Sequence, residues 1–311
     1  MKVQVRNLRK QFGKTVAVDN ISFAFDSGHV FGFVGPNGAG KTTTMRIIAT
    51  IEEPTDGDVL LNGISVREQP ELARKAVGYV PDTLPAHADI TVHEYLDFYA
   101  RAYGLRGAKR TESVAAIEEF TNVTGIRDKH LKALSKGMKQ RVSLGRALVY
   151  DPDVLILDEP AAGLDPRARV ELRELLALLA ERKKAILISS HILTELTEIC
   201  NGVVIIERGK VLETGTIEDV LKKSAPRRTV AVRLLNAAQL PELRKELLQT
   251  PFVENARETG GEIHFEISGE ADAACEILAQ LVSRRFRIVE FRQTKADLED
   301  IFMSVTKGGV Q

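Results

Sequence analysis

The stretch Gly35–Thr42 carries the residue types that bind a triphosphate. It reads Gly-Pro-Asn-Gly-Ala-Gly-Lys-Thr and fits the phosphate-loop pattern G-x-x-x-x-G-K-[ST]. An apolar run at residues 30–34 precedes it, and a run with helical spacing at residues 43–49 follows it. In that setting the glycines let several backbone N–H groups converge on one phosphate cluster at the positive end of a helix dipole. We expect Lys41 to reach the β- and γ-phosphates and the Thr42 hydroxyl to bind Mg²⁺.

Two carboxylates follow a second apolar run. Residues 154–157 read Val-Leu-Ile-Leu, and Asp158 and Glu159 come directly after them. At the carboxyl end of a parallel strand, Asp158 would lie beside the phosphate loop and hold Mg²⁺, directly or through water. Glu159 would then lie near the γ-phosphate and orient or deprotonate the attacking water. Together with the loop, the two acids indicate hydrolysis of a nucleoside triphosphate.

Composition narrows the setting of this chemistry. The chain has 311 residues, and its 43 basic residues balance 43 acidic ones. That length predicts about two domains, and a neutral chain has no global attraction for nucleic acid, so no nucleic-acid partner is expected. The two cysteines, Cys200 and Cys275, fit no metal-binding spacing and favour a reducing compartment. With no apolar run near the roughly 18 residues that span a bilayer, and no signal-peptide pattern at the start, we expect a cytoplasmic chain that a partner holds at the inner face of the membrane.

The periodicity of apolar residues predicts an α/β core interrupted by a helical insertion. Three short, β-branched runs suit central strands of a parallel sheet that is covered on both faces. These runs are residues 154–157, 185–188 and 203–206. Two short strands are expected before residue 27, and the spacing becomes helical from about residue 85 to 150. A helix from Arg167 to about Glu181 joins the first two of the three runs.

A change in composition marks a second domain. We assign residues 1–221 to the first domain, 222–228 to a basic linker and 229–311 to a second domain. After the linker the pattern predicts a strand, a helix, two strands, a helix and a strand, followed by a last helix at 295–305. This β-α-β-β-α-β order is ferredoxin-like.

Several motifs in order resemble the nucleotide-binding subunit of an ATP-binding cassette (ABC) transporter over about residues 1–220. Residues 134–141, Leu-Ser-Lys-Gly-Met-Lys-Gln-Arg, are similar to the family signature LSGGQ-x-QR and precede the two acids. Asp165 matches the family's loop that communicates across a dimer, and His191 matches its switch histidine. Phe12 occupies the place of the aromatic residue that stacks on adenine. The resemblance implies an α/β P-loop NTPase of the ABC cassette type, a mixed sheet with a helical insertion, followed by the small ferredoxin-like α+β domain.

The resemblance also implies how the site is completed. Ser135 and the N–H of Gly137 open a helix, and in this family they meet the γ-phosphate that the opposite subunit binds. Glu159 and His191 are the implied catalytic residues, and His191 would hydrogen-bond the γ-phosphate and align the water. The residues expected to bind ATP are Phe12, Gly35, Pro36, Asn37, Gly38, Ala39, Gly40, Lys41, Thr42 and Thr43, with Ser135 and Gly137 acting in trans.

The sequence departs from the family pattern in two places. Asp82 stands where the family commonly has a glutamine that touches Mg²⁺ or the lytic water. Asp82 either joins Thr42 and Asp158 as a metal ligand or is kept from that role by the added charge, and both readings stay open. The signature has Lys136 and Met138 where Gly and Gln are usual, a form that resembles cassettes of exporters whose membrane subunits are separate chains. Lys136 either adds positive charge near the partner's nucleotide or points to water.

We therefore predict the ATPase subunit of a membrane transporter, working as a pair of cassettes. ATP binding would close the dimer, and hydrolysis would reset it to drive export through a separate polytopic permease. The expected cofactors are ATP and Mg²⁺, and the expected partners are the permease and a second cassette.

Two alternatives remain at this point. The core motifs do not encode direction, so the ATPase of an importer stays open. A non-transport ABC ATPase is the other alternative, although this sequence has neither a long coiled coil between the two nucleotide motifs nor a second cassette. The second domain resembles those attached to cassettes of drug-, lipid- or polysaccharide-export systems, which favours export.

Overall fold

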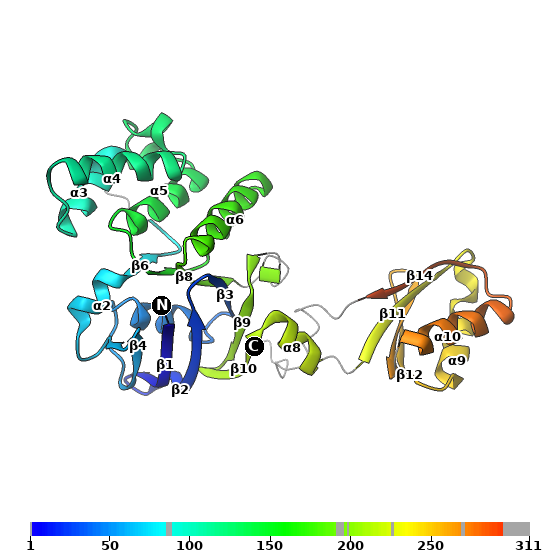
Figure 1. The fold of residues 1–311 in the computed structure, drawn as a ribbon. Helices are drawn as coiled ribbons and strands as arrows, with labels where there is room; N and C mark the ends of the chain where they lie inside the picture. The colour runs from blue at the N-terminus through cyan, green and yellow to red at the C-terminus, as the bar shows by residue number, and fades with distance from the viewer. Residues whose placement is uncertain are drawn as a thin grey trace. The chain divides into compact units, whose positions relative to one another are not determined.

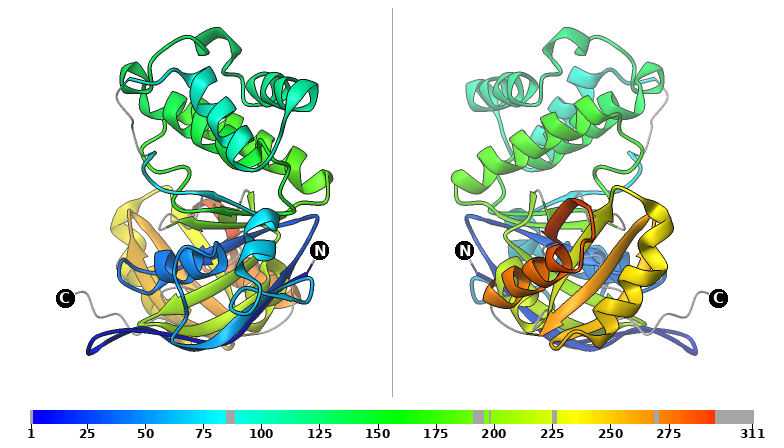
Figure 2. Two further views of the ribbon diagram at one scale, coloured as in Figure 1. Left: turned by 90° about the vertical axis from the view of Figure 1, so that its left-hand side faces the viewer. Right: turned by 90° about the vertical axis from the view of Figure 1, so that its right-hand side faces the viewer.

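The chain divides into two compact units, each described here by itself. A computed structural model describes residues 2–84, 89–190, 196–197, 199–224, 227–268 and 271–294. Unit 1 runs from Met1 to Ile217 and unit 2 from Glu218 to Gln311. Figures 1 and 2 show the ribbon in three views. No helix in the described ranges is both long and apolar enough to cross a membrane.

An antiparallel sheet forms one layer of unit 1, with the strand order β2-β1-β4-β5. Its strands are β1 (Lys2–Phe12), β2 (Thr15–Asp26), β4 (Asp56–Leu61) and β5 (Ile64–Ser65). Burial alternates along β1 and β2, so that Val3, Val5 and Phe25 face the core while many of their neighbours are exposed. Both strands are longer than the short strands that the sequence predicted.

A six-stranded sheet forms the centre of unit 1, with the order β10-β9-β3-β8-β7-β6. Its strands are β3 (His29–Val34), β6 (Val77–Val80), β7 (Val154–Leu157), β8 (Ala185–Ser190), β9 (Gly202–Glu207) and β10 (Lys210–Thr216). All neighbouring pairs are parallel except β10 with β9. Every residue of β7 and β8 is buried, as expected for parallel strands covered on both faces. The three predicted central strands are confirmed.

Helices cover this sheet and form the insertion. In unit 1 they are α1 (Lys41–Ile48), α2 (Pro70–Ala76), α3 (Val92–Ala102), α4 (Gly107–Phe120), α5 (Lys136–Leu148) and α6 (Pro166–Glu181). Two short 3₁₀ helices, Thr124–Ile126 and Leu131–Ala133, precede α5. Figure 1 shows α3, α4 and α5 together, on the far side of the central sheet from β1 and β2. The predicted helical insertion is therefore present, with its own core around Leu96, Val114 and Val142.

Unit 2 has the predicted ferredoxin-like order of elements. Its sheet, in the order β12-β13-β11-β14, is antiparallel throughout. The elements are α8 (Ile217–Ser224), β11 (Arg227–Leu234), a 3₁₀ helix (Ala237–Gln239), α9 (Leu240–Gln249), β12 (Val253–Thr259), β13 (Glu262–Ser268), α10 (Ala271–Ser283) and β14 (Ile288–Thr294). Figure 2 shows α9 and α10 on one face of the sheet, where Leu243, Leu247 and Ile277 join its core.

The range 222–228, predicted as a linker, overlaps the end of one element and the start of another. Lys222 and Lys223 belong to the last turn of α8, and Arg227 begins β11. Cations are favoured at a helix C-terminus because the dipole is negative there, so a basic pair is compatible with a helix end as well as with a solvated linker. The last helix predicted at 295–305 lies outside the described residues.

Candidate nucleotide site

The phosphate loop joins β3 to α1, and two of its glycines leave no space for a side chain. Gly40 has a φ of 103°, and a Cβ there would lie 2.5 Å from the carbonyl oxygen of Ala17. A Cβ on Gly35 would overlap the carbonyl oxygen of Ile206. Because α1 has no side-chain cap and no acid in its first turn, its leading N–H groups remain available to an anion. The loop therefore fits a phosphate group.

Lys41 lies between this loop and the two acids. Its side chain is buried, and its ammonium donates to the carbonyl oxygens of Gly35 (2.5 Å) and Pro36 (3.2 Å). The Oε1 atom of Glu159 lies 4.0 Å from the same nitrogen. Burial lowers the pKa of Lys41 below its ordinary value, while the charges of Glu159 and Asp158 act in the opposite direction. Anionic phosphate oxygens would stabilise this desolvated cation.

Asp158 and Glu159 follow β7, and the neighbouring strand β8 contacts both of them. The hydroxyl of Ser189 donates to Oδ1 of Asp158 at 2.7 Å, and the backbone N–H of Glu159 donates to the Ser189 oxygen at 2.8 Å. Glu159 has a φ of 49°, in the left-handed region that few residues other than glycine adopt. The structure thus brings Lys41, Asp158 and Glu159 together, as expected from their positions after β3 and β7.

The oxygen atoms at this edge suit Mg²⁺. Asp158 supplies a buried carboxylate, and Thr42 is exposed in the first turn of α1. In the described ranges, no three His, Cys, Asp or Glu side chains gather into a metal cage. Mg²⁺ commonly takes one or two carboxylates and completes its shell with water and substrate phosphates, so the residues fit an ion that binds with a nucleotide. Asp82 is exposed after β6, and none of its described contacts joins it to Thr42 or Asp158.

Phe12 lies at the end of β1 with 47% of its surface exposed. The Lys10 ammonium lies 4.8 Å from the centre of the Phe12 ring and 2.6 Å from a carboxylate oxygen of Glu52. This cation–π contact restrains the ring, which keeps exposed surface for stacking on a base.

The residues expected to act in trans make their described contacts within α5 and around the start of α6. Ser135 caps α5 by accepting from the N–H of Met138 at 3.3 Å. Gly137 faces Leu164 and Ala168, near the start of α6, and Asp165 caps α6 by accepting from the N–H of Ala168 at 2.8 Å. Among the described contacts, none joins Ser135 or Gly137 to the loop of residues 35–42.

Of the two remaining predicted residues, Lys136 and His191, the structure describes only Lys136. The Lys136 side chain is exposed and passes over Gly163, with its ammonium 2.6 Å from where a Cβ of that glycine would be. The predicted position of His191 lies outside the described residues.

Sequence reasoning missed the contact of Ser189 with both acids. The available signal was a polar residue at the end of an otherwise apolar, buried strand, β8. It gave no indication of a partner, because the order of the strands is not encoded locally.

A groove between the core and the helical insertion was also not predicted residue by residue. It has a volume of about 140 Å³ and is lined by Ala49, Ile51, Arg74, Val77, Tyr79, Tyr99, Tyr103, Arg146, Ala147 and Tyr150. Arg146 donates to the carbonyl oxygen of Tyr79 and lies 5.3 Å from the centre of the Tyr99 ring. Tyr103 and Tyr150 stack with ring centres 3.5 Å apart. Burial raises the pKa of Tyr79, and the negative charge of Asp158 raises it further, so Tyr79 lines the groove and also interacts with Asp158.

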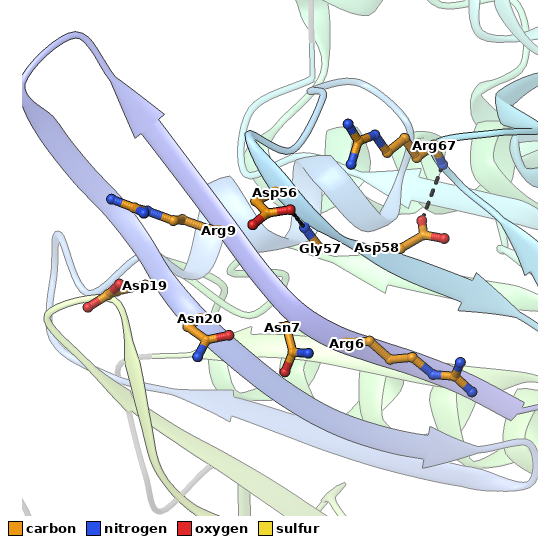
Figure 3. Close-up of a pocket in the computed structure, with 9 residues that line it drawn as sticks. All are labelled: Arg6, Asn7, Arg9, Asp19, Asn20, Asp56, Gly57, Asp58 and Arg67. Carbon is orange, nitrogen blue, oxygen red and sulfur yellow. Dashed lines mark hydrogen bonds between the residues drawn. The ribbon is translucent and has the colours of Figure 1, made fainter.

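A larger hollow of about 810 Å³ lies across β1, β2 and β4, and no residue of the phosphate loop lines it (Figure 3). It is lined by Arg6, Asn7, Arg9, Asp19, Asn20, Asp56, Gly57, Asp58 and Arg67. Its three arginines and three aspartates balance in charge. In Figure 3 the side chain of Arg6 points away from those of Arg9 and Arg67, and the three guanidinium groups share no centre. We therefore assign the nucleotide to the phosphate loop and no ligand to this hollow.

Comparisons with known proteins define the class. The ABC transporter family matches residues 18–162, and the C-terminal domain described as "ATP-binding protein DrrA1-3-like" matches residues 215–306. A solved ATP-binding subunit of an ABC transporter is 30% identical with a TM-score of 0.66, over 72% of this chain and 93% of that one. A nucleotide-free cassette of an ABC transporter, 24% identical with a TM-score of 0.64 over 71% and 96% of the two chains, shows the fold alone. The chain belongs to the ABC transporter family and is a nucleotide-binding ATPase subunit.

Two curated relatives narrow the class further. Nod factor export ATP-binding protein I of Cupriavidus metallidurans is 34% identical over 98% of this chain and 97% of its own. The protein of the same name from Ralstonia nicotianae is 32% identical over 98% and 93%. With the match of unit 2, they place the chain among the ATP-binding subunits of ABC exporters. The predicted family, ATPase activity and exporter class are confirmed.

Proposed function

We propose that this exporter ATPase hydrolyses MgATP in a site that two copies of the chain build together. The main support for this proposal is that the side chains of Lys41, Asp158 and Glu159 lie close together. The Lys41 ammonium is 4.0 Å from the Glu159 carboxylate. Lys41 and the loop N–H groups bind the phosphates, and Thr42 and Asp158 hold Mg²⁺, which neutralises charge on the phosphate oxygens when it is bound. Glu159 orients or deprotonates the attacking water, with His191 aligning it.

The second copy supplies the missing part of each site. Ser135 and Gly137 present the N-terminus of α5, yet their described contacts are with α5 itself and with the start of α6. An ATP bound to one loop would meet the Ser135 hydroxyl and the Gly137 N–H of the other copy only in the closed pair. These differential contacts favour closure with ATP and opening after hydrolysis, and Asp165 would report across the contact.

The groove is the proposed docking place of a separate membrane-spanning subunit. Ile51 lines it and is 57% exposed, and Phe98, equally exposed, packs edge-on against Tyr99 of the same groove. Arg74 and Arg146 add positive charge between aromatic rings. An amphipathic segment with an apolar face and an acidic side chain suits this lining. Docking there would hold the chain at the cytoplasmic face of the membrane, and the cargo would pass through the partner.

Trapping the closed pair tests the shared site. Glu159→Gln keeps the size and removes the charge, so bound ATP should persist and hold two copies together. We expect size-exclusion chromatography with light scattering to show a dimer with MgATP and a monomer without it. The control is Lys41→Met in the same background, which should stay monomeric. A monomeric Glu159→Gln chain that calorimetry shows to be saturated with MgATP would contradict the proposal.

Capture of the membrane partner tests the groove. The tagged chain should retain a polytopic membrane protein from detergent-solubilised membranes of its own cells. Ile51→Asp should lose that protein, whereas Leu178→Asp, at an exposed position on α6 outside the groove, should retain it. Equal retention by both variants would place the partner elsewhere.

A further inference from the structure

Ser189 sits at a buried junction of the two acids. It is the fifth residue of β8, between β3 and β7 in the sheet, and none of its surface is exposed. In the register of the parallel strands, Leu157 is opposite Ile188, which places Asp158 beside Ser189. The hydroxyl contacts Asp158 at 2.7 Å and the Glu159 N–H at 2.8 Å.

The chemistry of the hydroxyl assigns a direction to each contact. A serine hydroxyl has one proton to donate and two lone pairs to accept with. An ionised carboxylate only accepts, so Ser189 donates to Asp158, and a lone pair of the same oxygen receives the N–H of Glu159. One side chain therefore restrains both the Asp158 carboxylate and the backbone of Glu159.

The Glu159 backbone is in particular need of such a restraint. A left-handed φ of 49° is unfavourable for a residue with a side chain and persists only when its surroundings hold it. This conformation decides where the Glu159 carboxylate points, and the Oε1 atom now lies 4.0 Å from the Lys41 ammonium. Loss of the hydrogen bond at its N–H would let the carboxylate move relative to the phosphate loop.

We propose that Ser189 is a positioning residue for ATP hydrolysis, which fixes Asp158 for the metal ion and Glu159 for the attacking water. The inference rests on the roles proposed above for Asp158 and Glu159. The competing explanation is structural only: the hydroxyl satisfies two buried polar groups and has no effect on turnover beyond the amount of folded protein. Partners that orient a metal ligand typically affect metal affinity or activity by about 10- to 100-fold, which separates the two explanations.

The experiment compares two buried serines that undergo the same chemical change. Ser189→Ala removes the bridging hydroxyl. Ser143→Ala is the matched control, because Ser143 is also buried, on α5, and its hydroxyl has no partner in the part of the chain that the structure describes. Steady-state ATP hydrolysis by the full chain gives kcat and the KM for ATP. Mn²⁺ binding in the presence of ATP, followed by electron paramagnetic resonance, gives a readout independent of turnover.

We expect Ser189→Ala to lower kcat about 10- to 100-fold and to weaken Mn²⁺ binding about tenfold. The KM for ATP should change less than about threefold, since the phosphate loop and Phe12 are untouched. Ser143→Ala should match the wild type in every measurement. Ser189→Thr keeps the hydroxyl and should recover most of kcat, provided that the added methyl group is accommodated.

Three outcomes would overturn the proposal. The first is a Ser189→Ala chain with unchanged kcat and Mn²⁺ affinity; the second is an equal loss in Ser143→Ala. The third is a loss of kcat that only follows the folded fraction, measured by thermal unfolding and by ATP binding in EDTA. If Ser189→Ala does not fold, Ser189→Cys is measured instead. Its thiol is a weaker hydrogen-bond donor, so its kcat should be lower than that of the wild type but above zero.

Glu159→Gln separates a failure of this inference from a failure of the proposed function. If Glu159→Gln hydrolyses ATP at the wild-type rate, the proposed role of Glu159 is wrong. If Glu159→Gln is inactive while Ser189→Ala is fully active, only the positioning role of Ser189 is overturned.

Discussion

Replacing Lys41 by methionine tests the centre of the nucleotide site. Methionine keeps an unbranched stem and removes the ammonium, which now donates to the carbonyl oxygens of Gly35 and Pro36. The lowered pKa of Lys41 shows that burial disfavours its charge, so removal of the charge offsets part of the lost hydrogen bonding. We therefore expect a folded variant with a specific defect in nucleotide binding.

The size of the defect follows from the geometry around the ammonium. Glu159 shows that an anionic oxygen can lie 4.0 Å from it. At an effective dielectric constant of about 20, one unit of phosphate charge at about that distance contributes about 4 kcal/mol. Exchanging one carbonyl hydrogen bond of the charged ammonium for the phosphate offsets about 1.5–3 kcal/mol of this. The net loss in Lys41→Met is then about 1–2.5 kcal/mol, or roughly 5- to 60-fold in the dissociation constant of ATP.

Isothermal titration calorimetry with ATP and excess Mg²⁺ measures this loss directly. Lys184→Met is the control, because Lys184 is equally buried but pairs with Asp151, ahead of β7 and β8 and so at their opposite end from the acids. It should bind ATP like the wild type. The reasoning is refuted if Lys41→Met binds within threefold of the wild type while its thermal unfolding shows an intact fold.

Three further predictions concern the base, the loop and pH. Phe12→Ala should weaken ATP binding by about 1–3 kcal/mol through lost stacking and leave the binding of inorganic triphosphate unchanged; an equal loss for both ligands in calorimetry would argue against stacking. In Gly40→Ala the new Cβ would lie 2.5 Å from the Ala17 carbonyl oxygen, at a φ of 103°, so the free energy of unfolding measured with urea should fall by about 1–3 kcal/mol. Gly125→Ala has open space around its Cβ and should leave the free energy of unfolding nearly unchanged. Burial raises the pKa of Tyr150 above its ordinary value of 10.0, so the folded chain keeps a proton that the unfolded chain releases. The free energy of unfolding should therefore fall as the pH rises above about 10, and Tyr150→Phe should reduce that slope; an unchanged slope would show that other groups set it.

The phosphate loop and the acids were predictable because each is a local pattern. Gly35–Thr42 specifies its own backbone, and an apolar strand of the Val154–Leu157 type ends at the edge where parallel sheets bind ligands. The strands and helices of unit 2 were predictable for the same reason, since their alternation and spacing follow local rules. The basic pair Lys222 and Lys223 did not indicate the end of α8, because such a pair is compatible both with a solvated segment and with the last turn of a helix.

The groove shows a limit of periodicity. Tyr99 and Tyr103 recur at helical spacing, which indicates a helix but not which rings form its core. In the folded chain Tyr103 stacks on Tyr150, and both line the groove together with Tyr79. Tyr103 follows α3, Tyr150 follows α5 and Tyr79 belongs to β6. Their meeting depends on how the insertion packs against the core, which no single segment encodes.

The sequence by itself determined that this protein has a phosphate loop, a pair of acids after a strand and a second, ferredoxin-like unit. Each of these features follows from a pattern of residues that are neighbours in the sequence. Only the tertiary structure decided that β8 is inserted between β3 and β7, and so that the Ser189 hydroxyl reaches both acids. The physical reason is that strand order results from long-range packing of whole strands and helices, whereas a hydrogen bond of 2.7 Å needs the two strands to be direct neighbours in register.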